Sequence, residues 1–208
     1  MDLKIKAKKA VEILEKDYPE AVCSLNYDAP FQLLVATRLA AQCTDARVNM
    51  VTPELFEKYP DIFSMAAAEI SDIEECIKSC GLYKTKARDI KLCAEMLRDF
   101  FGCRVPDNME DLLKLPGIGR KTANLVLGDA FGKSAVVVDT HCIRITKRLG
   151  FHNLKDAEKI ERILKDILPA EKSNDFCHRL VLHGRAVCTA RNPKCDNCVM
   201  REICDKNI

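Results

Sequence analysis

A short glycine-rich turn between two helix-like segments is the strongest constraint on how this 208-residue chain can fold. It lies in the stretch 112–141, LLKLPGIGRKTANLVLGDAFGKSAVVVDTH. Pro116 cannot continue the helix that begins before it, because proline lacks an amide hydrogen and its ring clashes with the preceding turn. A second helix is predicted from about Arg120, where apolar residues recur at helical spacing. The pattern therefore predicts a helix–hairpin–helix motif over about 107–131.

The two glycines of this turn indicate what the motif could bind. Gly117 and Gly119 can both adopt a positive φ, and without a Cβ atom they let another surface approach the backbone closely. The amide groups of the turn and of the following helix start point in one direction, which suits a phosphate. We therefore predict that the hairpin holds a nucleic-acid backbone without contacting the bases.

The rest of the chain is also predicted to be helical. Pro53 and Pro60 are taken as breaks, and helical spacing of apolar residues predicts helices at 31–36, 54–56, 70–80, 85–101, 157–168 and 175–186. An N-terminal amphipathic helix is expected to turn these residues inward: Ile5, Ala10, Val11, Ile13 and Leu14. The only β-like run, 135–138, is too short and solitary to imply a sheet. The predicted fold class is therefore all-α.

Composition and charge exclude some classes of protein. The sequence is 48% hydrophobic and 31% charged, as in ordinary globular chains, and no apolar run approaches the ~20 residues of a membrane span. The N-terminal residues lack the apolar core of a signal peptide, so we expect a cytoplasmic, reducing location and no membrane partner. Residues 1–132 contain 18 basic and 21 acidic residues, whereas 133–208 contain 15 and 10. This asymmetry places the basic surface toward the C-terminal part.

Four of the twelve cysteines are grouped near the end of the chain. Their spacing is Cys188-x6-Cys195-x2-Cys198-x5-Cys204, so four thiolates within 17 residues could close on one metal centre. A Cys-x2-Cys pair is the usual chelating turn. The alternatives are a [4Fe–4S] cluster, a zinc site and unconnected thiols. Zinc sites commonly use two such pairs, and only one is present, which slightly favours the cluster.

Two basic residues, Arg191 and Lys194, lie between the first two of these cysteines. A loop pinned by a metal centre would present both side chains rigidly. We therefore expect them to contact phosphates of a nucleic acid.

Lys121 and Asp139 are the candidate catalytic residues. Lys121 follows the hairpin at a helix start beside Arg120, where the helix dipole and the neighbouring cation favour a neutral, nucleophilic amine; simple phosphate binding is the alternative. Asp139 precedes a predicted helix and could be its N-cap. It could also be a carboxylate that stabilises positive charge or transfers a proton near Lys121. One side chain could do both.

Gln42 and Leu82 carry weaker signals. By its own position, Gln42 would be a glutamine on a helix surface. The segment 78–90 weakly repeats 114–126, with a turn glycine followed by a bulky residue. This alignment places Leu82 at a loop tip, as an exposed apolar residue.

Together these residues resemble the endonuclease III family of DNA glycosylases, in the helix–hairpin–helix superfamily. The resemblance covers nearly the whole chain and is densest in LPGIGRKTANLVL, in VDTH and in HGRAVCTARNPKCDNCVMREIC. It implies two helical lobes that flank a DNA-binding cleft, a barrel over 22–132 and a lobe of 1–21 with 133–208. It also implies that the four cysteines hold a structural [4Fe–4S] cluster.

The same resemblance implies roles for the candidate residues. Lys121 matches the family's nucleophilic lysine and Asp139 its essential aspartate. Gln42 and Leu82 match residues that fill the gap and wedge the opposite strand when a damaged nucleotide is flipped out. The implied function is a monomeric, bifunctional DNA N-glycosylase and AP lyase of base excision repair, acting on duplex DNA with oxidised pyrimidines or abasic sites. A monofunctional mismatch glycosylase and a non-catalytic DNA-binding protein on the same scaffold are the alternatives.

Overall fold

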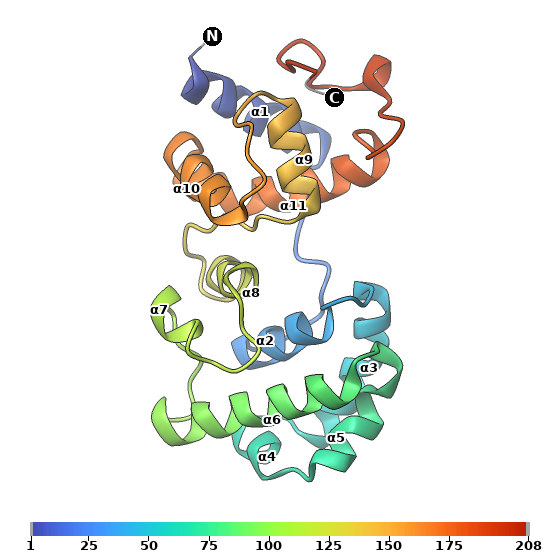
Figure 1. The fold of residues 1–208 in the computed structure, drawn as a ribbon, viewed down its shortest axis with the longest axis vertical. Helices are drawn as coiled ribbons and strands as arrows, with labels where there is room; N and C mark the ends of the chain where they lie inside the picture. The colour runs from blue at the N-terminus through green and yellow to red at the C-terminus, as the bar shows by residue number, and fades with distance from the viewer. Residues whose placement is uncertain (1, 207–208) are drawn as a thin grey trace. The chain divides into compact units, whose positions relative to one another are not determined.

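The computed structural model describes residues 2–206, and every regular element among them is a helix. The all-α prediction is therefore confirmed, and the run 135–138 is a buried, non-helical segment rather than a strand. The chain divides into two compact units, one of Ser24–Phe131 and one of Met1–Cys23 with Gly132–Ile208 (Figure 1).

The unit Ser24–Phe131 is organised around its longest helix, α6. Its elements are α2 (Pro30–Leu39), α3 (Asp45–Lys58), α4 (Ile62–Ala67), α5 (Ile70–Ile77), η1 (Lys78–Cys80), α6 (Tyr83–Phe100), α7 (Met109–Leu112), α8 (Arg120–Leu125) and η2 (Val126–Ala130). α6 packs against α2, α4 and α5, and its predicted apolar face is buried at Ala87, Ile90, Ala94 and Leu97. Burying one such aliphatic side chain stabilises the fold by about 1.5 to 3 kcal/mol. α6 is thus the scaffold that fixes the neighbouring turns.

One proline does not end a helix as expected. α3 continues through Pro53, so 54–56 belongs to a helix that has already run for two turns. An internal proline removes one backbone hydrogen bond. Val48, Thr52 and Leu55 are buried on both sides of it, and this tertiary packing outweighs the local preference.

The second unit contains the N-terminal helix and the C-terminal third of the chain. Its elements are α1 (Leu3–Asp17), α9 (Thr140–Arg148), α10 (Ala157–Ile167), η3 (Ala170–Lys172), α11 (Ser173–Ala186) and η4 (Cys195–Asn197). α11 packs against both α1 and α9. Beyond α11, the described residues up to 206 contain only the short turn η4, so this segment depends on side-chain contacts for its shape.

The inward face of α1 differs in part from the prediction. Ala10, Val11 and Leu14 are buried, but Ile5 is 54% exposed. Lys6 is buried instead, and its ammonium group pairs with Asp205. The partner carboxylate lets the lysine stem replace an aliphatic side chain at this position.

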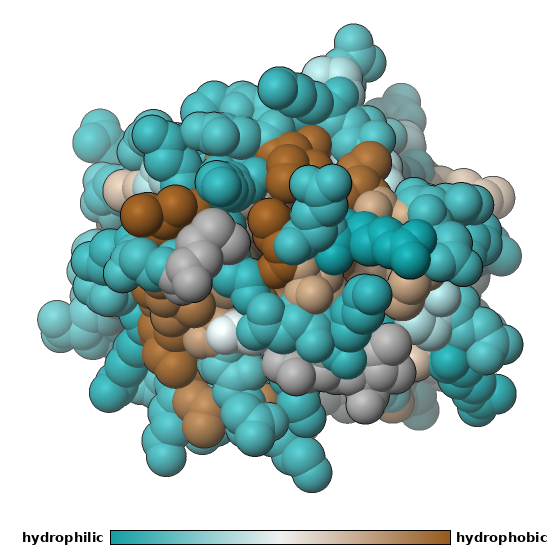
Figure 2. All heavy atoms as spheres, turned by 90° about the horizontal axis from the view of Figure 1, so that it is seen from above, coloured by the Kyte–Doolittle hydropathy of each residue, from teal (hydrophilic) through white to brown (hydrophobic). Residues whose placement is uncertain are grey.

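None of the helices in residues 2–206 is long and apolar enough to cross a membrane. In Figure 2 most of the visible surface is hydrophilic, and hydrophobic residues occupy smaller areas between polar side chains. The larger aliphatic side chains are instead concentrated inside each unit, where their burial drives folding.

Two leucines on α11 provide a test of this packing. Leu180 is fully buried, whereas Leu182 is 38% exposed. Leu180→Ala is expected to lower the free energy of unfolding by about 2 to 5 kcal/mol, because it leaves a cavity in the core. Leu182→Ala, the same chemical change on the same helix, should cost less than about 1 kcal/mol. Urea denaturation followed by circular dichroism measures both, and equal losses would contradict the assigned orientation of α11.

Candidate active site and metal centre

The predicted helix–hairpin–helix is present as α7, a turn, α8 and the π-helical turn η2. The turn is anchored by two buried side chains, Leu115 and Ile118, and the Ile118 amide donates to the Leu115 carbonyl at 3.2 Å. Gly119 is the N-cap residue of α8. Lys121 lies exposed in the first turn of this helix. The local sequence therefore positions the candidate nucleophile directly behind the hairpin.

The two hairpin glycines serve different needs. Gly117 has φ +74°, and a Cβ atom on it would lie 2.7 Å from Arg38 Nε and 3.0 Å from Asp89 Cβ. Gly119 was expected to allow a positive φ as well, but it has φ −100°, which any residue can adopt. A Cβ atom on Gly119 would meet nothing within 4 Å. Neither backbone conformation nor packing within the protein therefore requires glycine at this position. A requirement for glycine would come from another molecule that approaches the backbone closely.

A salt bridge lies beneath the turn and gives it a rigid base. Arg38 on α2 donates from Nε to Asp89 on α6 at 3.1 Å, and both side chains are mostly buried. A Cβ atom on Gly117 would meet Nε and Cδ of this arginine. The pair joins α2, α6 and the hairpin, so the position of α8 depends on three separated segments.

Gln42 and Leu82 share an uncommon backbone conformation. Their φ values are 56° and 48°, and they are two of only four non-glycine residues in 2–206 with positive φ. Gln42 is exposed in the turn between α2 and α3, so it does not lie on a helix surface as its sequence position suggested. Leu82 is 57% exposed at the N-cap of α6, the predicted loop tip. Such strain costs about 1 to 3 kcal/mol per residue and is concentrated at functional sites.

Asp139 has the N-cap role that its position indicated. It follows the buried run 135–138, and its Oδ1 accepts a hydrogen bond from the Cys142 amide at 2.7 Å. Its side chain is only partly buried. Capping therefore orients this carboxylate at the start of α9 while leaving it accessible. Asp139 lies in the second unit, whereas Lys121 belongs to Ser24–Phe131.

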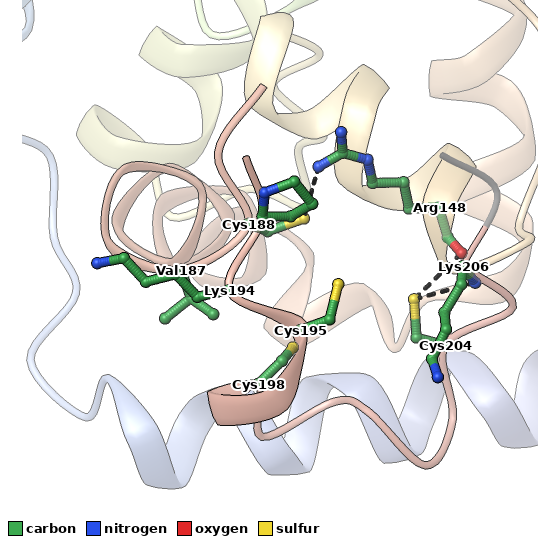
Figure 3. Close-up of a pocket in the computed structure, with 9 residues that line it drawn as sticks. Arg148, Val187, Cys188, Lys194, Cys195, Cys198, Cys204 and Lys206 are labelled. Carbon is green, nitrogen blue, oxygen red and sulfur yellow. Dashed lines mark hydrogen bonds between the residues drawn. The ribbon is translucent and has the colours of Figure 1, made fainter. Parts of the chain in front are cut away.

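The structure brings the four grouped cysteines together. They line one pocket with Arg148, Val187, Pro193, Lys194 and Lys206 (Figure 3). Across residues 2–206, no three or more His, Cys, Asp or Glu side chains are grouped closely enough to hold a single metal ion. The four sulfurs border a common space, and four cysteine thiolates are the ligand set that holds a [4Fe–4S] cluster.

The electrostatics of this pocket also fit a metal cluster. Burial raises the pKa of the Cys198 and Cys204 thiols, and the neighbouring cysteines raise the pKa of both further. Thiolates at Cys198 and Cys204 are therefore favoured only if positive charge lies beside them. Iron ions supply that charge, so the donor set fits a [4Fe–4S] group.

Two side chains that the sequence did not single out contact these sulfurs. Arg148 donates from Nη1 to Cys188 Sγ at 3.2 Å. His183 is fully buried, with Nδ1 3.3 Å from the Tyr18 hydroxyl and Nε2 3.5 Å from Cys198 Sγ. The contacts join residues 40 and 15 positions apart, so no local spacing could have indicated them. Groups at this distance from a ligand orient it and tune its charge.

Arg191 and Lys194 are both exposed in the loop that leads to η4. The backbone of this loop is held by Arg148, whose Nη2 donates to the Ala190 carbonyl at 3.0 Å. The Lys194 amine points away from the four sulfurs (Figure 3). Both cations are therefore available to an external anion.

The different roles of the hairpin glycines can be tested by one matched pair of substitutions. Gly117→Ala is expected to lower the free energy of unfolding by about 1 to 3 kcal/mol, because alanine is strained at this φ and its Cβ atom meets Arg38. Gly119→Ala should leave stability nearly unchanged and weaken duplex binding. Thermal unfolding and fluorescence anisotropy with labelled duplex measure the two effects. Equal stability of both variants would show that the turn is not packed as described.

Comparison with known proteins places this geometry in a family. A family model described as an HhH-GPD superfamily base excision DNA repair protein matches residues 35–170, and one described as the iron–sulfur binding domain of endonuclease III matches 188–204. Endonuclease III of Synechocystis sp. is 48% identical, covering 97% of this chain and 92% of the relative. Endonuclease III of Escherichia coli (strain K12) is 39% identical, covering 95% of each.

Comparison with solved structures indicates the same family. A trapped endonuclease III–DNA covalent intermediate, described as an estranged-adenine complex, has a TM-score of 0.91 at 41% identity and covers 99% of this chain and 97% of that one. A thermostable thymine-DNA glycosylase has a TM-score of 0.86 at 27% identity, covering 97% and 96%. The chain therefore belongs to the endonuclease III family, the bifunctional DNA glycosylases and AP lyases of base excision repair, and has the family's iron–sulfur domain.

Proposed function

We propose that this protein removes oxidised pyrimidines from duplex DNA through a Schiff base on Lys121 and then cuts the strand 3′ to the abasic site. The observation that supports this most directly is the exposed lysine in the first turn of α8, immediately after the hairpin. A 41% identical endonuclease III has been trapped as a covalent intermediate with DNA. An amine nucleophile accounts for such an intermediate.

The hairpin would provide grip without sequence preference. The open space around Gly119 and the start of α8 let a phosphate approach backbone amides. Contacts to phosphate position a protein on DNA but carry no base information. Repair of damage at any sequence requires this kind of binding, and the exposed Arg191 and Lys194 would add to it.

Access to the damaged nucleotide would depend on Gln42 and Leu82. A base must leave the stack before its C1′ atom can be attacked, which costs a few kcal/mol and less for a lesion. Both side chains are exposed at turns with a strained backbone. We propose that they enter the duplex and replace the lost stacking, Gln42 in the gap and Leu82 against the opposite strand.

The chemistry then follows from an amine and a carboxylate. The neutral amine of Lys121 attacks C1′, the glycosidic C–N bond breaks, and the base leaves with the electron pair and takes up a proton. Asp139 stabilises the positive charge that develops on the sugar and assists the proton transfers. Ring opening gives an imine that acidifies the 2′ hydrogens. Loss of one of them breaks the C3′–O bond, and water then releases the lysine.

The cluster would have a structural task. Cys188, Cys195, Cys198 and Cys204 would hold the [4Fe–4S] group, which supplies positive charge and cross-links a segment with little helix. Arg148 and His183 would orient two of these ligands. We further propose that the protein acts as a monomer in the reducing cytoplasm, where free thiols and such a cluster persist.

The covalent step predicts the behaviour of two variants. Lys121→Ala should abolish the adduct that borohydride traps with lesion DNA, because no amine remains to form the imine. Asp139→Asn should keep the α9 cap, since asparagine also caps helices well, yet lower turnover by about 100-fold or more. Gel electrophoresis of trapped complexes and of strands cleaved without alkali measures both.

The control for this experiment is Lys114→Ala, which removes an exposed lysine of the same motif that pairs with Glu110 and Asp111. This variant should trap DNA normally. Undiminished trapping by Lys121→Ala would overturn the assigned nucleophile. Base release without strand cleavage by the unmodified protein would instead favour a monofunctional glycosylase.

Phosphate contacts by the cysteine loop predict a change in salt dependence. Arg191→Ala and Lys194→Ala should each flatten the plot of log Kd against log salt concentration by about 0.9 unit, since one fewer counterion is released. Lys4→Ala is the control, because Lys4 is exposed but pairs with Asp166. Anisotropy titrations with duplex DNA at several salt concentrations give the slope for each variant. If the slopes of Arg191→Ala and Lys194→Ala equal that of Lys4→Ala, the proposed phosphate contacts are wrong.

A further inference from the structure

Lys86 is a completely buried lysine that the proposed chemistry does not use. It lies on α6 and has 0% exposure. Lysine is almost never fully buried unless its amine is satisfied. Here Nζ donates two hydrogen bonds of 2.8 Å, one to the Leu39 carbonyl and one to the Cys80 carbonyl. The two acceptors lie 47 and 6 positions away from it in the sequence.

These two carbonyls lie at the roots of the turns that present Gln42 and Leu82, meaning the last helical residue before each turn. Leu39 is the last residue of α2, three positions before Gln42. Cys80 is the last residue of η1, two positions before Leu82. The backbone amide of Lys86 also donates to the Leu82 carbonyl at 3.0 Å. A single residue therefore binds the backbone of both turns.

The groups around the amine are consistent with such a bridge. Burial lowers the pKa of Lys86, whereas the nearby thiols of Cys43 and Cys80 raise it. Cys43 is the neighbour of Gln42, so side chains from both turns lie close to the amine. A lysine amine has at least two N–H donors in either protonation state, and both carbonyls can be satisfied throughout.

From these contacts we propose that Lys86 is a positioning residue for nucleotide flipping. It holds the turns of Gln42 and Leu82 at a fixed separation, so that the two side chains enter the duplex together. The inference rests on the insertion roles proposed above for Gln42 and Leu82. Residues with positive φ need surroundings that over-determine their conformation, and hydrogen bonds at the roots of both turns provide this.

Helix α6 supplies a matched control residue. Lys91 also donates two hydrogen bonds to backbone carbonyls, to Ala66 at 3.1 Å and to Ala68 at 2.7 Å. Its acceptors lie at the end of α4, away from both turns in the sequence. Lys91→Met therefore removes two hydrogen bonds to backbone carbonyls from the same unit, together with an ion pair to Glu95, and Lys86→Met removes the bridge.

The test uses 2-aminopurine, which brightens when it is unstacked, placed opposite an uncleavable abasic analogue in duplex DNA. Lys86→Met is expected to slow the fluorescence rise about tenfold, because it removes both hydrogen bonds that tie the two turns to α6. The rate for Lys91→Met should stay within about twofold of that of the unmodified protein, which is the usual deviation for a site that does not interact with the turns. Binding of undamaged duplex should be the same for both variants. Equal rates for the two would overturn the inference.

A double-mutant cycle separates positioning from general stability. In a protein that also carries Gln42→Ala and Leu82→Ala, Lys86→Met should slow the rise by no more than about twofold, because the residues through which it acts are gone. A full tenfold effect in that background would show a structural role only. If Gln42→Ala with Leu82→Ala leaves the signal unchanged, the insertion roles fail. If that pair matters while Lys86→Met behaves like Lys91→Met, only the bridge fails.

Folding of the variants is checked by thermal unfolding. Lys86→Gln serves as the second variant, because its amide can reach one carbonyl and should restore part of the rate. Should both Lys86 variants unfold while Lys91→Met folds, Lys86 is a stability residue and the inference is wrong. Partial recovery of the rate by Lys86→Gln in a folded protein would support it.

Discussion

The turn at 116–119 is the constraint on which the chemistry of this protein depends. α7 already ends at Leu112, before Pro116, and Gly117 takes a left-handed conformation in which an added Cβ atom would meet Arg38. Because Arg38 is held by Asp89, this contact ties the start of α8 to both α2 and α6. Lys121 thereby has a defined position on a helix of only six residues, and that helix would not be stable alone. A local break in the chain and a long-range ion pair together position the lysine that we propose as the nucleophile.

In the other unit, the residues after α11 have almost no regular secondary structure, so other interactions must fix their shape. Cys188, Cys195, Cys198 and Cys204 converge on one pocket, and Arg148 binds the adjoining backbone. Buried thiols resist ionisation, so the shape of this segment and the charge of the iron–sulfur group are coupled. The cluster therefore does for this loop what a hydrophobic core does for the helices.

Backbone strain and a buried lysine amine lie together at the turns that are proposed to enter DNA. Gln42 and Leu82 have left-handed backbones although neither is glycine, and the buried amine of Lys86 binds the carbonyls at the roots of both turns. Each feature alone destabilises a fold. The insertion that we propose would account for their coincidence at one place, because exposed side chains on a constrained backbone can fill a gap in a duplex without first being ordered.

Several features were determined by the sequence alone, because they depend on residues close together in the chain. They include the all-α class, the helix–hairpin–helix, the place of Lys121 at a helix start and the grouping of the cysteines. Only the tertiary structure decided the others. It put Gly117 rather than Gly119 in the left-handed region, carried α3 through Pro53 and turned Ile5 outward. Lys86 repeats with Ile90 and Leu97 on the apolar face of α6, and this spacing could have marked it as buried. Its bond to Leu39 spans 47 positions, however, and helical periodicity carries no information about contacts that distant.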